Sequence, residues 1–291
     1  MTAATRGPVQ VTGEVLSSKR TGAYQHLTLV APGVAERFRP GTLVALAVGG
    51  ALSDRMLRRS FPVYRVRATG AYKSTLEIVL APEEPGEAWV AALPAGAEVD
   101  VVGPFGRPYA LPKEPVPCTL VGVGHAAAPL FSLAERLRER GCAVHMVLGG
   151  RSDKDLFGAL EAKRAAKTVV VTTEDGSVGM RGGVAAVLPD LLRRTASDVV
   201  YAAGPAATLH EVAAAAEQHG AWSQTALEVG LACATGSCLR CVVPAVGEDG
   251  ISRMVRACVE GPVFRGDRVR WADLGTVPPD TWGAGGGGDG A

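Results

Sequence analysis

The first third of the chain alternates apolar and polar residues in short runs. Six runs are rich in β-branched residues and have the length of strands: Val9–Ser18, Tyr24–Val30, Leu43–Val48, Phe61–Val66, Thr75–Leu80 and Glu98–Val102. Gly and Pro separate them, as in Pro32-Gly33, Pro40-Gly41 and Gly49-Gly50. Several short strands at this spacing predict a small antiparallel β-barrel.

From about residue 115 the pattern changes to apolar runs that alternate with helical segments. Four apolar runs are predicted as buried strands: Cys118–Val123, Ala143–Leu148, Thr168–Thr172 and Asp198–Ala203. Leu130, Leu133 and Leu137 recur at helical spacing before Gly141, and a second helix is predicted over Leu209–Gln218. This alternation predicts a parallel sheet built of βαβ units.

The chain is therefore predicted to be of mixed β and α/β class. Its parts are an antiparallel β-barrel over residues 1–112, a parallel α/β domain over 113–222 and a small segment over 223–270. The tail, residues 271–291, turns polar and Gly-rich, and we expect disorder from about residue 277 on. Residues 1–8 are also predicted to be loose.

Four of the six cysteines fall in one short window near the C-terminus. Cys233, Cys238, Cys241 and Cys258 have the spacing C-x4-C-x2-C-x16-C. Thiolates are soft ligands that suit zinc or an iron–sulfur cluster. Zinc sites usually use two C-x2-C pairs, whereas this spacing is the plant-type [2Fe–2S] arrangement. The spacing favours a [2Fe–2S] cluster, with structural zinc and four metal-free cysteines as alternatives.

Small residues neighbour these cysteines. Gly236 suits a loop that wraps tightly around a metal, and Ala232, Ala234 and Ser237 let backbone amides approach the sulfurs. Such hydrogen bonds tune the reduction potential. Because a [2Fe–2S] centre moves one electron at a time, we expect the rest of the chain to supply or accept those electrons.

Composition and charge exclude some classes of partner. The formal net charge is +1 over 291 residues, so neither a basic face nor a nucleic-acid partner is expected. The chain has no run of 18 or more apolar residues and no apolar signal core at its N-terminus, which argues against a membrane span and for a cytoplasmic location. Clustered thiols suit that reducing compartment, and Cys118 and Cys142 are predicted to be buried and inert.

Two arginines open one of the predicted strands, in the run Leu57–Val63. Arg58 and Arg59 at a strand start can clamp a pyrophosphate, because the guanidinium fork matches phosphate oxygens. A solvated basic turn is the alternative. The turn from Val102 to Gly106 closes the predicted barrel, and a turn without a ligand role is its default interpretation.

Glycines end the first predicted strand of the α/β domain. Gly122 and Gly124 precede a helix, which lets the backbone approach a phosphate at the helix N-terminus. The G-x-G-x-x-G fingerprint is incomplete because Ala127 holds its third position, and an ordinary tight turn is the alternative. Gly204 and Pro205 end the fourth strand at the same sheet edge, where such sheets bind ligands.

The other polar residues of this edge have simpler interpretations. Thr173–Ser177 follows the third strand and is either part of the site or a surface turn. His125 stands alone in its turn and is predicted to be a local hydrogen-bonder. The sequence shows no Ser/His/Asp or H-E-x-x-H constellation, so no side chain is assigned as catalytic and the chemistry is expected to belong to cofactors.

The order barrel, nucleotide domain and cysteine cluster resembles the ferredoxin reductase superfamily. Within it, the chain is similar to the electron-transfer subunit of the two-subunit, NAD-dependent dihydroorotate dehydrogenase over roughly residues 9–270. The most specific matches are Leu227-Glu228, the loop from Cys233 to Cys241, and Arg256–Phe264. Further matches follow in order and spacing: residues 102–106, Ala128-Pro129-Leu130, Asp175-Gly176-Ser177 and Gly204-Pro205.

The resemblance implies a FAD-binding barrel. The family's flavin motifs fall on Arg59, Ser60, Phe61 and Pro62, on Val79, Leu80 and Ala81, and on Gly86 and Glu87. Three positions depart from the pattern, since Pro62 replaces a Ser, Ala81 an Arg and Glu87 a Thr. These changes remove donors and add a carboxylate near a pyrophosphate, with Arg58 as a compensating cation.

The resemblance also implies an NAD-binding α/β domain and a [2Fe–2S] cluster held by Cys233, Cys238, Cys241 and Cys258. Gly122, Gly124, Gly204 and Pro205 would admit NAD(H). In this turn and edge, Ala126 replaces a Gly and Ala203 replaces a Cys of the family. Both positions therefore depart from the family's pattern as well.

The implied activity is that of an oxidoreductase subunit in pyrimidine biosynthesis. It would move electrons between NAD(H), FAD, the cluster and an FMN-containing dihydroorotate dehydrogenase-like catalytic subunit, in a hetero-oligomer such as a heterotetramer. One alternative is the same reductase architecture serving another redox partner, of the ferredoxin:NADP, hydrogenase-linked or tailoring type. A zinc-stapled, non-catalytic binding module is the alternative from another class.

Overall fold

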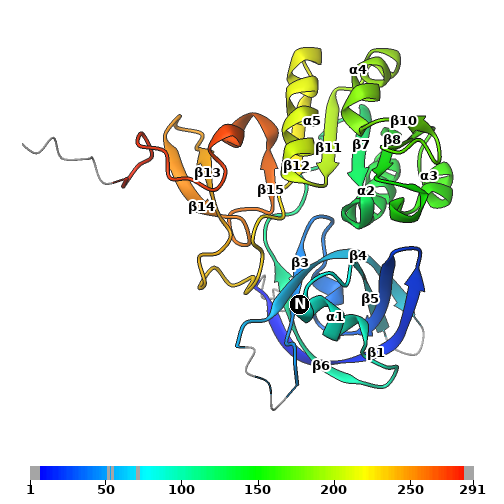
Figure 1. Ribbon diagram of the computed structural model, residues 1–291, viewed down its shortest axis with the longest axis vertical. Coiled ribbons are helices and arrows are strands. Elements are labelled where there is room, and N and C mark those ends of the chain that lie inside the picture. The colour runs from blue at the N-terminus through cyan, green and yellow to red at the C-terminus, as the bar shows by residue number, and fades with distance from the viewer. Residues whose placement is uncertain (1–6, 51–52, 54–55, 70–72, 285–291) are drawn as a thin grey trace, which may run out of the picture.

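The computed structural model describes residues 7–50, 53, 56–69 and 73–284. A β-barrel, an α/β layer and a smaller C-terminal hairpin lie around a common junction (Figure 1). The longest helix among these residues has 14 residues, and none of them combines the length and apolarity needed to cross a bilayer. The mixed β and α/β class predicted from the sequence is confirmed.

Six antiparallel strands close the barrel in the order β1-β2-β5-β4-β3-β6. They are β1 (Val9–Thr21), β2 (Tyr24–Val30), β3 (Leu43–Leu46), β4 (Arg59–Thr69), β5 (Lys73–Leu80) and β6 (Glu98–Phe105). The 3-10 turn η1 (Ala35–Arg37) follows β2, and helix α1 (Pro85–Ala91) joins β5 to β6. Alternate strand residues point inward, so that Leu27, Val44 and Ile78 fill the interior. All six predicted strands are present.

A seven-stranded sheet forms the α/β layer in the order β10-β9-β8-β7-β11-β12-β15, parallel except for β15. Its strands are β7 (Pro117–Val123), β8 (Ala143–Gly150), β9 (Thr168–Thr173), β10 (Met180–Arg181), β11 (Val199–Ala203), β12 (Trp222–Ala226) and β15 (Val263–Arg265). Its helices are α2 (Ala128–Glu139), α3 (Ala159–Ala165), α4 (Val184–Thr195) and α5 (Ala206–His219), with 3-10 turns η2 (Gly124–Ala127) and η3 (Asp153–Asp155).

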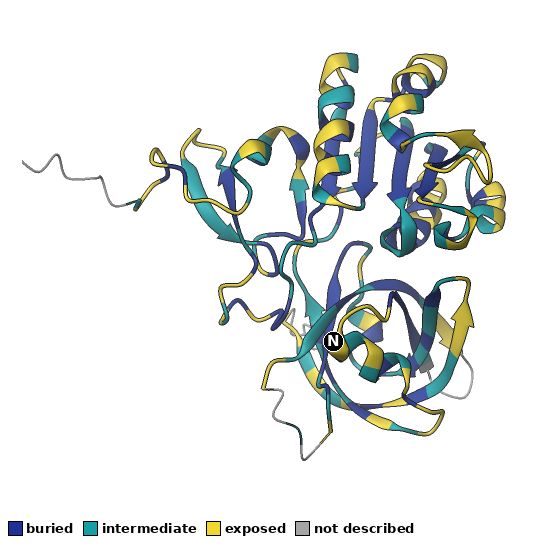
Figure 2. Cartoon of the chain, viewed as in Figure 1, coloured by how far each residue is buried: buried dark blue, intermediate teal, exposed yellow. Residues whose placement is uncertain are grey.

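Helices cover both faces of this sheet, and the strands between them are buried (Figure 2). Leu120 packs on the α2 side with Phe131, whereas the next residue, Val121, packs on the α4 side with Leu188. Successive residues of a strand point to opposite faces, so a strand buried on both sides must be apolar throughout. This explains why the sequence shows continuous apolar runs here.

Some elements escaped the sequence analysis for local reasons. Helix α3 has only seven residues, and α4 carries Pro189 in its interior, where proline is unfavourable. Strand β10 has only two residues. Short or interrupted segments give no sustained periodicity, so the sequence offers no signal for them.

The two cysteines outside the C-terminal window are buried in the α/β layer. Cys118 lies in β7 and is fully buried, and Cys142 precedes β8 with 5% exposure. Burial, with a smaller contribution from Cys142, raises the pKa of the Cys118 thiol. Both thiols are free, which agrees with the predicted buried, inert cysteines.

After β12 the C-terminal part leaves the α/β sheet, and it returns to the sheet at β15. Between β12 and β15 the chain forms a hairpin of β13 (Val242–Val246) and β14 (Ser252–Arg256), and the 3-10 turns η4 (Gly266–Arg268) and η5 (Trp271–Asp273) follow. Strands β12 and β15 pair with each other, so the predicted segment 223–270 shares this sheet with 113–222. The domain boundaries at 112, 222 and 270 stay predictions.

Disorder from about residue 277 is wrong for residues 277–284. Arg270 Nη1 donates to both carboxylate oxygens of Asp280 at 2.7 Å, and Thr281 is 4% exposed. The backbone N–H of Trp282 donates to the Ser252 carbonyl at 2.8 Å. These contacts fix the segment against β14. The remaining calls on the termini, 1–6 and 285–291, lie outside the described residues.

Polar contacts join the barrel to its neighbours. The Tyr24 hydroxyl donates to the Asp155 carbonyl at 2.6 Å, and Arg65 forms an ion pair with Glu161. At the turn that closes the barrel, the Arg107 N–H donates to the Gly261 carbonyl at 2.5 Å. A Cβ at Gly106 would lie 2.6 Å from Pro262 Cδ, so this turn packs against the C-terminal part. The default interpretation, a turn without a ligand role, stays a prediction.

Candidate functional site

The hairpin β13–β14 brings two of the four clustered cysteines together. Cys241 precedes β13 and Cys258 follows β14, and the pairing of Val242 with Arg256 aligns them. Their Sγ atoms are 3.4 Å apart. The sixteen residues between these cysteines therefore form one hairpin and its flanking residues.

The loop of residues 229–241 carries the other two sulfurs. The backbone N–H and thiol of Cys238 hydrogen-bond to Cys233, and the Gly236 N–H reaches the sulfur of Cys258. Gly236 has φ +78°, and a Cβ there would lie 2.7 Å from Val259 Cγ2, so only glycine fits without displacement. The backbone amides thus approach the sulfurs as the small residues of this loop led us to expect.

The surroundings shift the pKa values of two of the thiols in opposite directions. Burial acts to raise the pKa of Cys233, but donors from Thr235 and Cys238 outweigh it and lower the pKa to about 5. Burial, and next the neighbouring Cys241, raise the pKa of Cys258 to about 12. Cys233 is therefore prepared to be a thiolate, whereas a thiolate at Cys258 needs a cation beside it.

In the described part of the chain, no three His, Cys, Asp or Glu side chains converge as ligands of one metal ion. Cys238 acts on Cys233, Cys241 lies beside Cys258, and the charge of Cys233 also acts on Cys258, so the four sulfurs form one group. Both a single zinc ion and a two-iron cluster can take four such ligands. The two-iron interpretation therefore rests on the spacing of the cysteines in the sequence.

A groove of about 210 Å³ lies between the barrel and the cysteine loop. From the barrel side it is lined by Arg59, Ser60, Phe61, Glu84 and Glu87, and from the C-terminal side by Glu228, Gly230, Leu231 and Arg240. Four residues predicted for FAD therefore line this groove: Arg59, Ser60, Phe61 and Glu87. A fifth, Gly86, packs against the Arg59 side chain. A Cβ at Gly86 would lie 2.9 Å from Arg59 Cγ and Nε.

Two polar atoms in this groove have no partner. Arg59 Nε and Ser60 Oγ are buried without a hydrogen bond, and the carboxylate of Glu84 stays 3.9 Å from Arg59 Nε. A buried donor left unpaired costs about 1–3 kcal/mol, so such atoms usually await a ligand. Both residues line the groove, so a phosphate-bearing group bound there would lie beside their side chains, and the residues present fit the implied FAD.

The other predicted flavin residues have mixed placements. Phe61, Val79 and Leu80 are at most 3% exposed and their side chains belong to apolar cores, so only their backbones are free to contact a ligand. Pro62 is half-buried opposite Leu43 in the barrel. Ala81 lines the pocket described next rather than this groove.

The charges around the groove differ from the sequence-based expectation. Arg58 does not compensate for the lost donors, because its guanidinium donates to Asp100 Oδ1 at 2.5 Å on the far side of the strand start. The carboxylate of Glu87 accepts the N–H groups of Glu84 at 3.0 Å and Glu83 at 3.2 Å, as part of a capping box. Its charge is thereby directed at the first turn of α1.

A larger pocket, of about 570 Å³, lies where the α/β sheet edge faces the barrel. Gly124, Gly204 and Pro205 line it from the sheet edge, and Ala81 lines it from the barrel. A Cβ at Gly124 would lie 2.9 Å from the Tyr24 hydroxyl, which shows how closely the two domains approach. Gly122 lies deeper, where its missing Cβ lets Ala127 of η2 sit against the strand. Gly122 thus allows close strand–helix packing.

Several lining residues of this pocket carried no sequence signal. Tyr24 comes from β2, Arg151 and Asp155 follow β8, and Thr208 lies in α5. Tyr24 and Thr208 are far apart in the sequence, so only the fold brings these residues together. His125, predicted as a local hydrogen-bonder, also lines the pocket, and its ring lies 5.3 Å from that of Tyr24. Burial lowers the pKa of His125, so it is neutral at pH 7.

The turn after β9, predicted as either part of the site or a surface turn, contains residues of both kinds. Glu174 lines the pocket. Asp175 instead accepts the Ser177 N–H at 2.9 Å and the Ser177 hydroxyl at 2.7 Å, which is a local turn contact. One residue of Thr173–Ser177 therefore reaches the site and two shape the turn.

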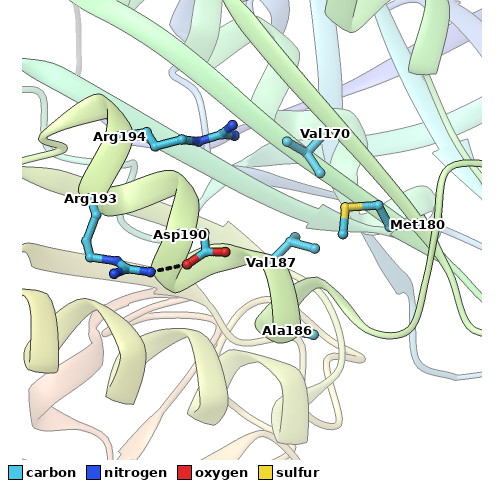
Figure 3. A pocket seen from close by; sticks show the side chains of 7 residues that line it. All are labelled: Val170, Met180, Ala186, Val187, Asp190, Arg193 and Arg194. Carbon is cyan, nitrogen blue, oxygen red and sulfur yellow. Dashed lines mark hydrogen bonds and ion pairs between the residues drawn. The ribbon is translucent and has the colours of Figure 1, made fainter.

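Another cavity, of about 520 Å³, lies away from all predicted site residues (Figure 3). It is formed by α4 with β9 and β10, and Val170, Met180 and Val187 give it an apolar wall. At its rim Arg193 forms an ion pair with Asp190 within one helical turn. Among the described residues, its lining contains no cysteine, histidine or hydroxyl side chain, and Met180 is its single sulfur. The redox chemistry is not expected there.

The comparisons with known proteins agree on one family. A family model for the iron–sulfur cluster binding domain of dihydroorotate dehydrogenase B matches residues 228–270. The dihydroorotate dehydrogenase B (NAD(+)) electron transfer subunit of Geobacillus kaustophilus is 32% identical over 266 residues, covering 91% of this chain and 98% of the relative. The chain belongs to this family. The Listeria monocytogenes subunit is also 32% identical, over 75% of this chain and 83% of the relative.

Solved structures place these electron transfer subunits among ferredoxin reductase-like proteins. The NADH-dependent reduced ferredoxin–NADP oxidoreductase, solved in work on flavin-based electron bifurcation, has a TM-score of 0.77. It is 26% identical and the match covers 91% of each chain. A ferredoxin NADP+ reductase from Neisseria gonorrhoeae, solved with FAD and NADP, shares the fold with a TM-score of 0.57 and 16% identity over 73% of this chain and 92% of its own. The family and fold predicted by resemblance are confirmed.

In this electron transfer subunit, Glu228 lines both the groove and the larger pocket. Burial, and next the charge of Glu87, raise the pKa of Glu228 from 4.5 to about 7. The carboxyl group is therefore half-ionised near neutral pH. Among the residues that line the two cavities, Glu228 is the one that lines both.

Replacing Glu228 with glutamine should remove a pH dependence of stability. Between about pH 4.5 and pH 7 the folded protein keeps a proton that the unfolded chain has lost, so stability falls as pH rises through this window. At about pH 8, Glu228→Gln should be more stable than the parent by roughly 2 kcal/mol, after allowance for partial exposure. Urea unfolding at pH 5 and pH 8, with equal cofactor loading, measures the difference.

The matched control for this test is Glu211→Gln, a carboxylate on the exposed face of α5. That variant should follow the parent at both pH values. A parent and a Glu228→Gln variant that lose stability equally between pH 5 and pH 8 would contradict the assignment.

Proposed function

We propose that this chain carries electrons between NAD(H) and the catalytic subunit of a dihydroorotate dehydrogenase, through FAD and a [2Fe–2S] cluster. The observation that carries the proposal is the continuity of three sites. Glu228 lines both the pocket and the groove, and Leu231 and Arg240 of the cysteine loop line the groove opposite Arg59. Nucleotide, flavin and cluster would thus occupy adjacent places in the order that electron transfer requires.

Cys233, Cys238, Cys241 and Cys258 would hold the cluster. Their spacing suits a two-iron cluster, and the N–H groups of Cys238 and Gly236 point at sulfurs. Hydrogen bonds to sulfur stabilise the more negative, reduced state and so raise the reduction potential. Cys238 is partly exposed whereas the other three are buried, so we expect this end of the cluster to face the partner.

Arg59 and Ser60 would bind the FAD pyrophosphate with the two buried polar atoms that have no other partner. The bound flavin supplies the chemistry that the side chains lack, because it exchanges a hydride with NAD(H) and exchanges single electrons with the cluster. Glu87 holds the α1 turn beside it, and Gly86 leaves room for the Arg59 side chain.

NAD(H) would enter the larger pocket at the sheet edge, where Gly124, Gly204 and Pro205 leave the backbone accessible. Tyr24 and His125 form the wall toward the barrel. In the dihydroorotate-oxidising direction, electrons would reach NAD+ from the catalytic subunit through this chain. Free, buried thiols are consistent with a reducing compartment, and we infer the cytoplasm.

The test is anaerobic reconstitution of the chain with iron, sulfide, FAD and a dihydroorotate dehydrogenase catalytic subunit. We expect NAD+ reduction by dihydroorotate in the complex, and an electron paramagnetic resonance signal of a two-iron centre after reduction. A colourless protein that binds zinc stoichiometrically would refute the proposal in favour of a zinc-stapled module.

The same preparation separates the proposal from its nearest rival. The structural likeness to a ferredoxin–NADP oxidoreductase favours a ferredoxin as the other partner to be tried. Cluster-dependent electron transfer to ferredoxin, with none to or from the dihydroorotate-oxidising subunit, would replace the proposed partner while leaving the cofactors in place.

A further inference from the structure

The larger pocket is strongly acidic for a site that would take an anionic dinucleotide. Its lining includes the carboxylates of Glu83, Asp155 and Glu174 and the half-ionised Glu228, against a single guanidinium, that of Arg151. Because His125 is neutral, it does not change this balance. An additional phosphate would therefore meet mostly negative charge here.

The one guanidinium of the pocket is already paired. Arg151 Nη2 lies 3.1 Å from Asp155 Oδ1, and the Ser152 hydroxyl donates to the other carboxylate oxygen at 2.9 Å. The Asp155 carbonyl also accepts the Tyr24 hydroxyl at 2.6 Å, which fixes the backbone of η3 against the barrel. Asp155 is thereby held in place from three directions, while 74% of the Arg151 side chain is exposed.

Charge beside the adenosine ribose decides between the two nucleotides. An acid there favours NAD, and an arginine nearby accommodates the 2′-phosphate of NADP. Strand β8 is the second strand of this unit, and Arg151 follows it directly. Arginine alone would thus favour NADP, in conflict with the acidic surroundings.

We propose that Asp155 is a specificity-determining residue that makes this pocket select NAD(H) over NADP(H) by neutralising Arg151. The inference rests on the proposed function, because it assumes that the pocket is the nucleotide site. A 2′-phosphate carries about −1.5 to −2 charges at neutral pH. To bind it, Arg151 has to leave a positioned carboxylate, and the carboxylate remains nearby as a repulsive charge.

Asp155→Asn tests the proposal, since it removes one charge and keeps the shape and the carbonyl that accepts the Tyr24 hydroxyl. The probes are adenosine 2′,5′-bisphosphate and 5′-AMP, titrated calorimetrically into the FAD-loaded protein. We expect the preference for the 2′-phosphorylated probe to increase about tenfold, equivalent to about 1.4 kcal/mol. Affinity for 5′-AMP should change little, and the ratio of kcat/KM for NADPH to that for NADH should rise in parallel.

Two further variants decide whether the effect belongs to the pair. Asp153→Asn, two residues away on the exposed side of η3, makes the same change in net charge and should leave the preference unchanged. Arg151→Ala combined with Asp155→Asn should abolish the gain, because no guanidinium is then available. A gain that persists in the double variant, or that Asp153→Asn reproduces, overturns the proposal.

The outcomes also separate this inference from the function on which it rests. If neither probe binds in any variant, the pocket is not the nucleotide site and the proposed function is wrong. If both probes bind to the parent but Asp155→Asn leaves their ratio unchanged, the site stands and only the role of Asp155 is wrong. If Asp155→Asn does not fold, Asp155→Ser carries the same test.

Discussion

Replacing Cys238 with serine should reduce electron transfer between this subunit and its catalytic partner by roughly 100-fold or more. Changes in the outer shell of a metal site already cost about 10–100-fold, and a lost ligand should exceed that range. A serine hydroxyl is a harder and weaker ligand for iron than a thiolate. NADH-dependent reduction of an artificial dye should continue, because the flavin groove and the nucleotide pocket contain none of the four cysteines.

The measurement is a pair of steady-state assays on the reconstituted complex, one with dihydroorotate and NAD+ and one with NADH and dye. Cys142→Ser is the matched control, because it makes the same chemical change at a buried thiol of the α/β layer. It should keep both activities. Loss of both activities in Cys238→Ser, with an unchanged fold, would refute the proposed order of carriers.

Replacing Arg59 with alanine should weaken FAD binding about 10- to 100-fold. A hydrogen bond to a charged group contributes about 1.5–3 kcal/mol, and each 1.4 kcal/mol is a factor of ten in the dissociation constant. We expect Arg59 to make such a bond to FAD, because its Nε is buried and has no hydrogen-bond partner in the protein. Flavin fluorescence during titration of the apoprotein with FAD gives the dissociation constant directly.

Arg58→Ala is the control for this prediction, since it removes the same charge one residue earlier. Arg58 pairs with Asp100 and does not line the groove, so FAD affinity should stay near that of the parent. Equal loss of affinity in both variants would place the pyrophosphate elsewhere.

The cysteine cluster could be predicted from the sequence because its signal is local. Three of the four ligand candidates fall within nine residues, and the chain between Cys241 and Cys258 is a single hairpin. Short-range spacing fixes which sulfurs can approach one another once the loop closes. Gly236 adds to this signal, because a side chain there would collide with Val259.

The flavin and nucleotide residues were predicted less completely, for a physical reason that differs between positions. Phe61 and Leu80 match the family's motif, yet their side chains fill the barrel, since a motif does not state whether the backbone or the side chain makes the contact. Gly122 matches the phosphate-binding turn, yet its missing Cβ makes room for Ala127. Arg58 and Arg59 are adjacent in sequence, yet Arg58 pairs with Asp100 whereas Arg59 lines the groove.

The sequence by itself determined the strand and helix pattern, the order of the parts and the identity of the four clustered cysteines. Periodicity and spacing act over a few residues, so the chain encodes them locally. Only the tertiary structure decided that Tyr24, Asp155 and Glu228 share one pocket, and that Glu228 continues into the flavin groove. The charge of these cavities depends on groups brought together from distant elements, and burial there moves the pKa of Glu228 to about 7.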